Sequence, residues 1–261
     1  MDEPRVALSL DGPVAHVMLS RPDRRNALDG AAVREPREAV AAASARDETR
    51  VIVLAGRGAV FCAGADLEWM KTVSSYSREE NVADAAALVE RFETIDCSPK
   101  AVVVCVQGAA LGGGAGLVAV ADVAVAEETA QFGFTEVRLG LVPAVISPYV
   151  VRKIGVSAAR QLFVTGERFS APRAAELGLV HRVVPHTALD QAVDGRVREL
   201  LQAAPGAIAA AKRLVRNVSA RPVEGVRELT IELIAERRSS PEGQEGLAAF
   251  LEKRKPDWAA G

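Results

Sequence analysis

Short runs of β-branched and aliphatic residues indicate buried strands throughout the first half of the chain. The clearest are Val14–Leu19, Val51–Ala55 and Ala101–Val106, which are too short for buried helices and end at loops. Arg5–Leu10 precedes the first run, and Asp11-Gly12-Pro13 between the two is a turn sequence. The pattern therefore predicts an opening β-hairpin followed by further buried strands.

The segment from Ala101 to Glu136 combines a strand, a run of glycines and a carboxylate. Gly112 to Gly114 follow the strand, and we expect a short apolar helix to begin at about Ala115. Glycines before a helix let backbone N–H groups approach a ligand closely, and a helix start favours negative charge. Glu136 lies on a later loop between two glycines, which makes it a candidate general acid or base beside an anion-stabilising loop.

The sequence repeats at a spacing of 50 residues. Val51 to Leu67 reads VIVLAGRGAVFCAGADL, and Ala101 to Leu117 reads AVVVCVQGAALGGGAGL. Strand falls on strand, and Gly64 corresponds to Gly114. Two strand–loop–helix units of this kind predict stacked turns that share a core. They also predict two glycine-containing loops whose N–H groups converge on one oxygen atom, with similar packing but no shared function as the alternative.

Helices dominate the rest of the pattern. One is predicted from a cap at Asp29 to about Ser44, and another ends near Ile95 after a polar, mobile segment from Trp69 to Glu80. The remaining predicted elements are strands at Asp122–Ala126 and Val180–Val184, helices that end at Gly155 and Gly166, a helix at Ala171–Leu177, and a helical tail from His186 to Trp258. We therefore predict an α/β fold with a core of residues 1–195 and a helical C-terminal region of residues 196–261.

Composition favours a globular protein that binds small molecules or copies of itself. The 261 residues are 49% hydrophobic with a net charge of −2, so no nucleic-acid surface is indicated. No apolar run approaches the roughly 18 residues of a membrane span, and the start lacks a signal-type apolar core. Cys62, Cys97 and Cys105 have neither CxxC spacing nor histidine neighbours, which argues against disulfides or a metal site and favours the cytoplasm.

Two familiar catalytic patterns are disfavoured by their context. Gly114-Ala-Gly116-Leu-Val-Ala119 imitates a dinucleotide-binding fingerprint, but several residues separate it from the strand and its helix is too short for a crossover. A nucleophilic hydrolase is disfavoured because the chain has no GxSxG motif. His16, His181 and His186 are far apart and lie in or beside apolar runs, so they are interpreted as structural residues.

Several motifs together resemble the enoyl-CoA hydratase/isomerase, or crotonase, superfamily. They are Arg21-Pro-Asp-Arg-Arg-Asn-Ala-Leu28, Phe61-Cys-Ala-Gly-Ala-Asp-Leu67, Ala110-Leu-Gly-Gly-Gly-Ala-Gly-Leu117, Phe132-Gly-Phe-Thr-Glu136, Ala174-Ala-Glu-Leu-Gly-Leu-Val180 and Phe250-Leu-Glu-Lys-Arg-Lys255. The resemblance implies a spiral of ββα units with a helical C-terminal trimerisation region, and hence a homotrimer or a dimer of trimers. It also implies an acyl-CoA thioester substrate and no metal or redox cofactor, with coenzyme A present only as part of the substrate.

The resemblance also implies roles for individual residues. The backbone N–H groups of Ala65 and Gly113 would form an oxyanion hole that stabilises charge on the thioester oxygen, and Glu136 would be the catalytic carboxylate. The remaining implied residues would hold the CoA part of the substrate: Ala63, Asp66, Leu67 and Glu68 beside adenine and pantetheine, and Arg24, Arg25 and Lys253 near the phosphates.

One position departs from the family pattern. Hydratases of this family usually carry two glutamates, and the first falls on Gly116 in this chain. Single-glutamate members include Δ3,Δ2-enoyl-CoA isomerases, so three functions stay open: a hydratase, an isomerase and a catalytically weak acyl-CoA binding protein. For a hydratase, we expect ordered water or a polar side chain in the space beside Gly116. The run from Gly140 to Val151 most resembles bacterial hydratases of 3-methylglutaconyl-CoA or related branched enoyl-CoAs of leucine and terpenoid breakdown.

Overall fold

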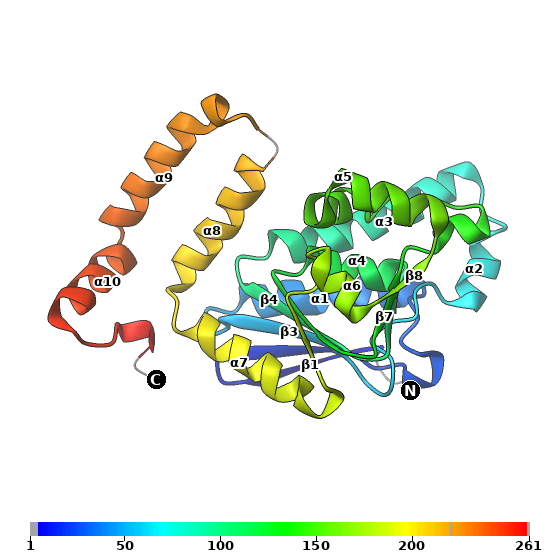
Figure 1. The fold of residues 1–261 in the computed structure, drawn as a ribbon, viewed down its shortest axis with the longest axis horizontal. Helices are drawn as coiled ribbons and strands as arrows, with labels where there is room; N and C mark the ends of the chain where they lie inside the picture. Colours follow the sequence, from blue (N-terminus) through cyan, green and yellow to red (C-terminus); the bar gives the residue numbers. More distant parts are fainter. Residues whose placement is uncertain (1–4, 220, 260–261) are drawn as a thin grey trace.

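The body of the protein is built on a six-stranded sheet (Figure 1). The computed structural model describes residues 5–219 and 221–259, without the side chains of residues 31–33. The strands of this sheet are β1 (Val6–Asp11), β2 (Val14–Leu19), β3 (Val51–Gly56), β4 (Ala101–Val106), β6 (Val123–Glu127) and β9 (Arg182–Val184). Their order is β1-β2-β3-β4-β6-β9, with β1 antiparallel to β2 and the other neighbours parallel. The predicted hairpin and strands are confirmed.

The 50-residue repeat corresponds to a pair of neighbouring strands. β3 and β4 are parallel, with Val51 opposite Ala101 and Leu54 opposite Val104, which is the offset seen in the sequence. The loops that follow these strands also lie together, since Cys62 forms a β-bridge with Ala110. The prediction of stacked strand–loop–helix turns is confirmed.

Three short strands that the sequence pattern did not reveal form a second sheet. They are β5 (Ala109–Leu111), β7 (Gln131–Gly133) and β8 (Arg168–Ser170), with β7 parallel to β5 and antiparallel to β8. Strands of this length show too little alternation to be distinguished from loops. This sheet positions two functional segments, because β5 ends directly before Gly112 and β7 ends shortly before Glu136.

Helices cover both faces of the large sheet (Figure 1). The α-helices are α1 (Gly30–Ala45), α2 (Leu67–Val73), α3 (Arg78–Cys97), α4 (Gly113–Val120), α5 (Ser147–Thr165), α6 (Ala171–Glu176), α7 (Leu189–Leu201), α8 (Pro205–Val218), α9 (Arg227–Ser239) and α10 (Pro241–Glu252). Strand residues such as Val53 and Val103 pack against α7 on one face, and Ile52 and Leu54 belong to the larger cluster with α1, α3, α4 and α5 on the other. Gly155 breaks the regular geometry of α5, and Gly166 caps its end, as predicted.

Two stretches are more helical than predicted. The first residues of the expected polar, mobile segment, 69–73, belong to α2. The Asp66 carboxylate accepts hydrogen bonds from the N–H groups of Glu68 (2.8 Å) and Trp69 (3.4 Å) and so caps this helix. α4 begins at Gly113 rather than Ala115, after Gly112 with a φ of 51°. The glycines are therefore part of the helix start and not only of the loop before it.

The last helices form an arm that extends away from the body. α8 leaves α7 at the edge of the body, and α9 and α10 fold back beside it (Figure 1). The division into residues 1–195 and 196–261 stays a prediction. Among the described residues, none of the helices has the length and apolar character needed to cross a membrane.

Candidate active site

Glu136 turns its side chain toward the glycine loop that precedes α4. A Cβ atom built on Gly112 would lie 3.3 Å from Glu136 Oε1, so the missing side chain makes room for the carboxylate. Its other oxygen, Oε2, is buried and has no hydrogen-bond partner among the described residues. Burial raises the pKa of Glu136 above its ordinary value, against a smaller opposing effect of a backbone hydrogen bond. A half-buried carboxylate with an unpaired oxygen is suited to take up and release a proton.

Two backbone N–H groups line the same space. The N–H of Leu28 donates to Gly64 O (2.7 Å), and the carbonyl of Leu28 accepts from Asp66 N (2.9 Å). Because successive N–H groups alternate in direction along an extended segment, the N–H of Ala65 points to the opposite side. Gly113 is the first residue of α4, where N–H groups lack a partner within the helix. Neither Ala65 N nor Gly113 N donates to an acceptor in the described part of the chain.

Ala65, Gly113 and Glu136 line two adjoining cavities. The smaller cavity has a volume of about 200 Å³ and is walled mainly by apolar side chains. These include Leu28, Leu88, Phe92, Val142, Val145 and Ile146. The larger cavity has a volume of about 710 Å³ and extends along α2, where Leu67, Met70 and Val73 line it. The two N–H groups and the carboxylate thus stand where a small apolar space meets a larger one.

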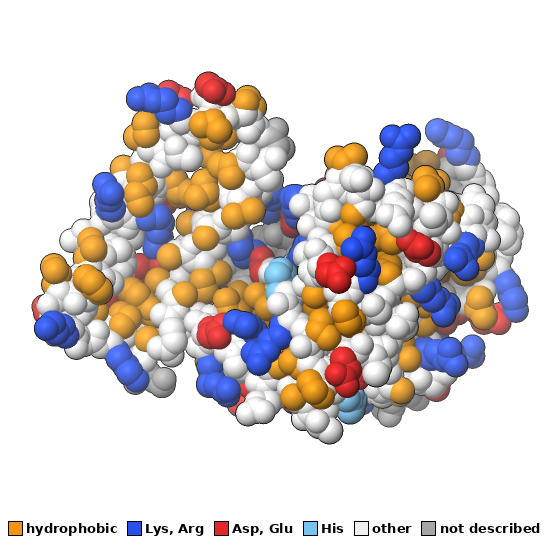
Figure 2. All heavy atoms as spheres, in the orientation of Figure 1, with side chains coloured by type: hydrophobic (Ala, Val, Ile, Leu, Met, Phe, Trp, Pro, Cys, Tyr) orange, Lys and Arg blue, Asp and Glu red, His pale blue; other side chains and the backbone are white. Residues whose placement is uncertain are grey.

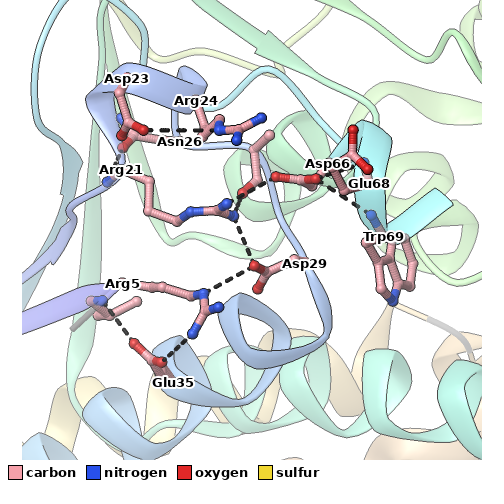
Figure 3. A network of polar contacts seen from close by, with 12 residues as sticks. Arg5, Arg21, Asp23, Arg24, Asn26, Asp29, Glu35, Asp66, Glu68 and Trp69 are labelled. Atoms are coloured by element: carbon pink, nitrogen blue, oxygen red, sulfur yellow. Dashed lines mark hydrogen bonds and ion pairs between the residues drawn. The ribbon is translucent and has the colours of Figure 1, made fainter. Parts of the chain in front are cut away.

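An ion-pair network holds the loop between β2 and α1 against the start of α2 (Figure 3). Arg21 pairs with Asp66 at 2.9 Å and with Asp29 at 3.0 Å. Asn26 is buried with a φ of 54°, accepts from Arg21 N, and donates to two carbonyls of the loop after β3. These contacts fix residues 21–28 beside the extended segment that carries Ala65. Sequence reasoning had noted the arginines of this loop but not this positioning function of Arg21.

The segment that was expected to hold adenine and pantetheine lies along the larger cavity. Ala63 and Leu67 line that cavity, and Leu67 is 74% exposed. Asp66 is buried, which by itself raises its pKa, but hydrogen bonds from the N–H groups of Glu68 and Trp69 and the charge of Arg21 bring the pKa below its ordinary value. Its carboxylate is therefore committed to capping α2. The exposed side chain of Glu68 pairs with Lys71 at 2.9 Å.

The three basic residues expected near the CoA phosphates do not lie together in one chain. Arg24 and Arg25 are exposed on the loop between β2 and α1, and Arg25 has a φ of 51°. Arg24 lines a shallow depression with Arg21 and Glu68. Lys253 follows α10, at the far end of the arm from the α2 side of the body (Figure 1). The phosphate-binding functions of these residues stay predictions.

The space beside Gly116 is filled by apolar side chains. A Cβ atom on Gly116 would lie 2.3 Å from Ile146 Cγ2 and 2.9 Å from Phe92 Cε1. These distances are far below normal contact, so even alanine does not fit without movement of its neighbours. The polar group that we expected here for a hydratase is absent among the described side chains, because Ile146 and Phe92 occupy the position.

Arg91 was missed by the sequence reasoning. It lies on α3, is 1% exposed, and lines the smaller cavity. Leu88, Phe92 and Ile95 of the same helix also face inward. A charged residue at helical spacing within this apolar stripe is the signal that would have revealed it.

His181, His186 and Cys62 lie outside the two cavities that Glu136 lines. His181 accepts a hydrogen bond from Ala124 N (2.9 Å), and His186 pairs with Glu127 at the end of the same strand. Cys62 packs under Gly114, and burial raises the pKa of its thiol to about 11. None of these side chains lines either cavity that contains Glu136.

Comparison with known proteins agrees with this geometry. The family model described as Enoyl-CoA hydratase/isomerase matches residues 10–261. The chain belongs to the enoyl-CoA hydratase/isomerase family. Members of this family act on acyl-CoA thioesters, and the protein is an enzyme of the hydratase/isomerase kind.

Individual relatives cover nearly the same length. The structure of an enoyl-CoA hydratase from Shewanella pealeana has a TM-score of 0.94 and 39% identity, and the match covers 97% of this chain and 96% of that one. Enoyl-CoA hydratase AFT6-1 of Alternaria alternata is 35% identical over 92% of this chain and 78% of its own length. Enoyl-CoA isomerase/hydratase fer4 of Mycosarcoma maydis is 32% identical over 97% of this chain and 95% of its own. The predicted crotonase fold with its helical C-terminal region is confirmed.

Proposed function

We propose that the protein is an enoyl-CoA hydratase in which Glu136 is the single acid–base residue. The observation that carries this proposal is the unpaired Oε2 of Glu136 on the cavity that also exposes the free N–H groups of Ala65 and Gly113. A thioester oxygen between the two N–H groups would bring the adjacent double bond beside the carboxylate. Relatives that are named hydratases support the same reaction.

The reaction follows from the charges that must be stabilised. Glu136 takes a proton from water while the water oxygen attaches to C3 and the double-bond electrons move onto the thioester oxygen. The N–H groups of Ala65 and Gly113 stabilise that charge, and removing one such donor typically costs about 2.7–4 kcal/mol. The positive end of α4 adds to the effect at Gly113. Glu136 then returns the proton to C2, which restores the carboxylate.

A second candidate, a Δ3,Δ2-enoyl-CoA isomerase, is favoured by the space beside Gly116. Ile146 and Phe92 fill this space, so among the described side chains no second polar group is available there to hold water. In an isomerase, Glu136 alone would move a proton between C4 and C2, and an apolar wall would protect the intermediate from water. The fer4 protein, whose name combines both activities, is a relative of this chain.

The acyl group that we propose is short and branched, such as that of 3-methylglutaconyl-CoA. The small volume of the smaller cavity, about 200 Å³, supports a short chain. The CoA part would follow the larger cavity along Ala63 and Leu67, with Arg24 and Arg25 nearest to the phosphates.

We further propose that the arm mediates self-association into a trimer or a dimer of trimers. Its helices expose many apolar side chains that would lose contact with water in an assembly (Figure 2). Among them are Val215, Ile231, Ile234, Leu247, Phe250 and Leu251. Because Lys253 stands on this arm, its function at a CoA phosphate would require the site of a neighbouring copy.

Three substrates, one variant and one control variant test the proposal. With crotonyl-CoA and 3-methylglutaconyl-CoA, hydration removes the absorbance of the conjugated thioester; with a 3-enoyl-CoA, isomerisation creates it. Glu136→Gln should lower either activity by about 10²- to 10⁴-fold while CoA-ester binding persists. Glu93→Gln, on the exposed side of α3, is the matched control and should keep full activity. Full activity of Glu136→Gln refutes the assignment, and binding without any turnover identifies an acyl-CoA binding protein instead.

A further inference from the structure

The proposed reaction leaves one buried charge in the smaller cavity without a function. Nε and Nη1 of Arg91 are buried and have no hydrogen-bond partner in the described part of the chain. The guanidinium lies over the ring of Phe92, 4.5 Å from its centroid, and forms no ion pair with a described carboxylate. Buried polar groups are normally hydrogen-bonded and buried charges are normally paired, so this arrangement requires an explanation.

Neighbouring groups do not neutralise Arg91. Burial lowers its pKa to about 10, and Cys62 and Asp84 act in the opposite direction. The guanidinium is therefore still charged at neutral pH. Burial keeps the Cys62 thiol neutral, with a pKa of about 11, and also raises the pKa of Asp84, two helical turns away on α3. Glu136, on the same cavity, makes no ion pair with Arg91.

The position of Arg91 places its guanidinium close to the proposed thioester site. A Cβ atom built on Gly113 would lie 3.6 Å from Arg91 Nη2. Gly113 supplies one of the two N–H groups that we assign to the thioester oxygen. An acyl chain that starts there and enters the smaller cavity, of about 200 Å³, therefore passes the guanidinium within a few carbon atoms.

We propose that Arg91 binds a carboxylate on the acyl group, so that the preferred substrates are CoA monothioesters of short dicarboxylic acids. A carboxylate would supply both the missing hydrogen-bond acceptors and the missing negative charge, whereas a hydroxyl or ketone would supply only acceptors. The planar guanidinium suits two parallel hydrogen bonds to a carboxylate. The other cavity walls, such as Leu88 and Val145, are apolar and match the carbon chain. The inference rests on the proposed function, because it assumes that the acyl chain occupies this cavity.

The main rival is that Arg91 stabilises the thioester oxygen itself, as a third donor beside Ala65 and Gly113. In that case, loss of Arg91 would slow the turnover of every enoyl-CoA equally. A carboxylate anchor instead affects only substrates that carry the second carboxylate. The two functions of Arg91 are therefore separated by comparing matched pairs of ligands.

Calorimetric titration with unreactive saturated thioesters tests the inference. The probes are succinyl-CoA against butyryl-CoA and glutaryl-CoA against valeryl-CoA, which match in chain length. The wild type should prefer the better dicarboxylic probe by about 30-fold or more, the size expected when one partner of a buried charge pair is removed. Arg91→Met should abolish or reverse this preference and bind the neutral probes at least as well. Arg160→Met, an exposed arginine of α5, is the control and should behave as wild type.

Further variants and outcomes decide the question. Without ligand, Arg91→Met should unfold at the same or a higher temperature, because it removes an unpaired buried charge. Arg91→Lys, which keeps the charge but loses the planar fork, should retain only part of the preference. Equal binding of charged and neutral probes by the wild type overturns the inference while leaving the proposed function intact. Equal loss of crotonyl-CoA turnover and of dicarboxylic turnover in Arg91→Met assigns Arg91 to the oxyanion and also overturns it. Failure to bind any of the four thioesters contradicts the proposed function itself.

Discussion

Replacement of Gly116 by alanine tests whether the space beside this residue could hold a side chain such as the family's first glutamate. The new Cβ atom would stand 2.3 Å from Ile146 Cγ2 and 2.9 Å from Phe92 Cε1. Overpacking of a core by one carbon typically costs about 1–3 kcal/mol, and the better helix propensity of alanine returns up to about 1 kcal/mol. We therefore expect Gly116→Ala to lower the free energy of unfolding by about 1–2 kcal/mol. A larger Gly116→Glu side chain should be worse still, with little gain in hydration.

A matched helical glycine provides the control. Gly195 lies inside α7, and a Cβ atom there would meet nothing within 4 Å. Gly195→Ala should therefore stabilise the protein, by about 0.5–1 kcal/mol. The two variants should thus differ by about 1.5–3 kcal/mol, and at roughly 2–4 °C per kcal/mol for a chain of this size their Tm values should differ by about 3–12 °C. Calorimetry of both proteins at one pH measures this difference.

Ile146→Leu identifies the source of the cost. Leucine keeps the volume of isoleucine but lacks the Cγ2 methyl group that meets Gly116, so the double variant should recover part of the stability lost in Gly116→Ala. The double-mutant cycle should show a favourable coupling of about 0.5–3 kcal/mol. Two results would refute the packing argument: additive effects of Gly116→Ala and Ile146→Leu on stability, or a Gly116→Ala protein as stable as Gly195→Ala. Either result would mean that the space beside Gly116 can accommodate a water molecule.

Three other outcomes are expected. Because burial raises the pKa of Glu136, its charged form destabilises the folded state as pH rises through that pKa. The gain in Tm of Glu136→Gln over the wild type should therefore be larger at pH 7.5 than at pH 4. An equal gain at both pH values contradicts the raised pKa. Arg25→Ala should weaken CoA-ester affinity at low salt while sparing the turnover of bound substrate, and unchanged affinity at low salt would identify Arg25 as a solvated loop residue. Phe250 is 81% exposed on the arm, so Phe250→Glu should shift sedimentation toward smaller species, whereas a wild-type monomer at micromolar concentration refutes the trimer.

Several features of this protein follow from the sequence alone because they depend on neighbouring residues in the chain. Short β-branched runs such as Ala101–Val106 form strands wherever they are buried, and the spacing of 50 residues became the register between β3 and β4. The glycines at the start of α4 and the isolated carboxylate of Glu136 were recognisable as candidate reactive groups in the sequence. Local signals of this kind indicated the glycine loop and the carboxylate to which we assign the proposed reaction.

Tertiary structure decided what depends on residues that are distant in the chain. The space beside Gly116 is closed by Phe92 from α3 and by Ile146 from the residues before α5, and no pattern near Gly116 specifies either contact. The three strands of the small sheet are too short to carry periodicity, so only their mutual pairing defines them. Arg91 differs from a solvated arginine only through its burial and its missing partners. Packing between distant segments therefore determines the shape and charge of the smaller cavity, while the local sequence determines the groups that we propose act on the thioester.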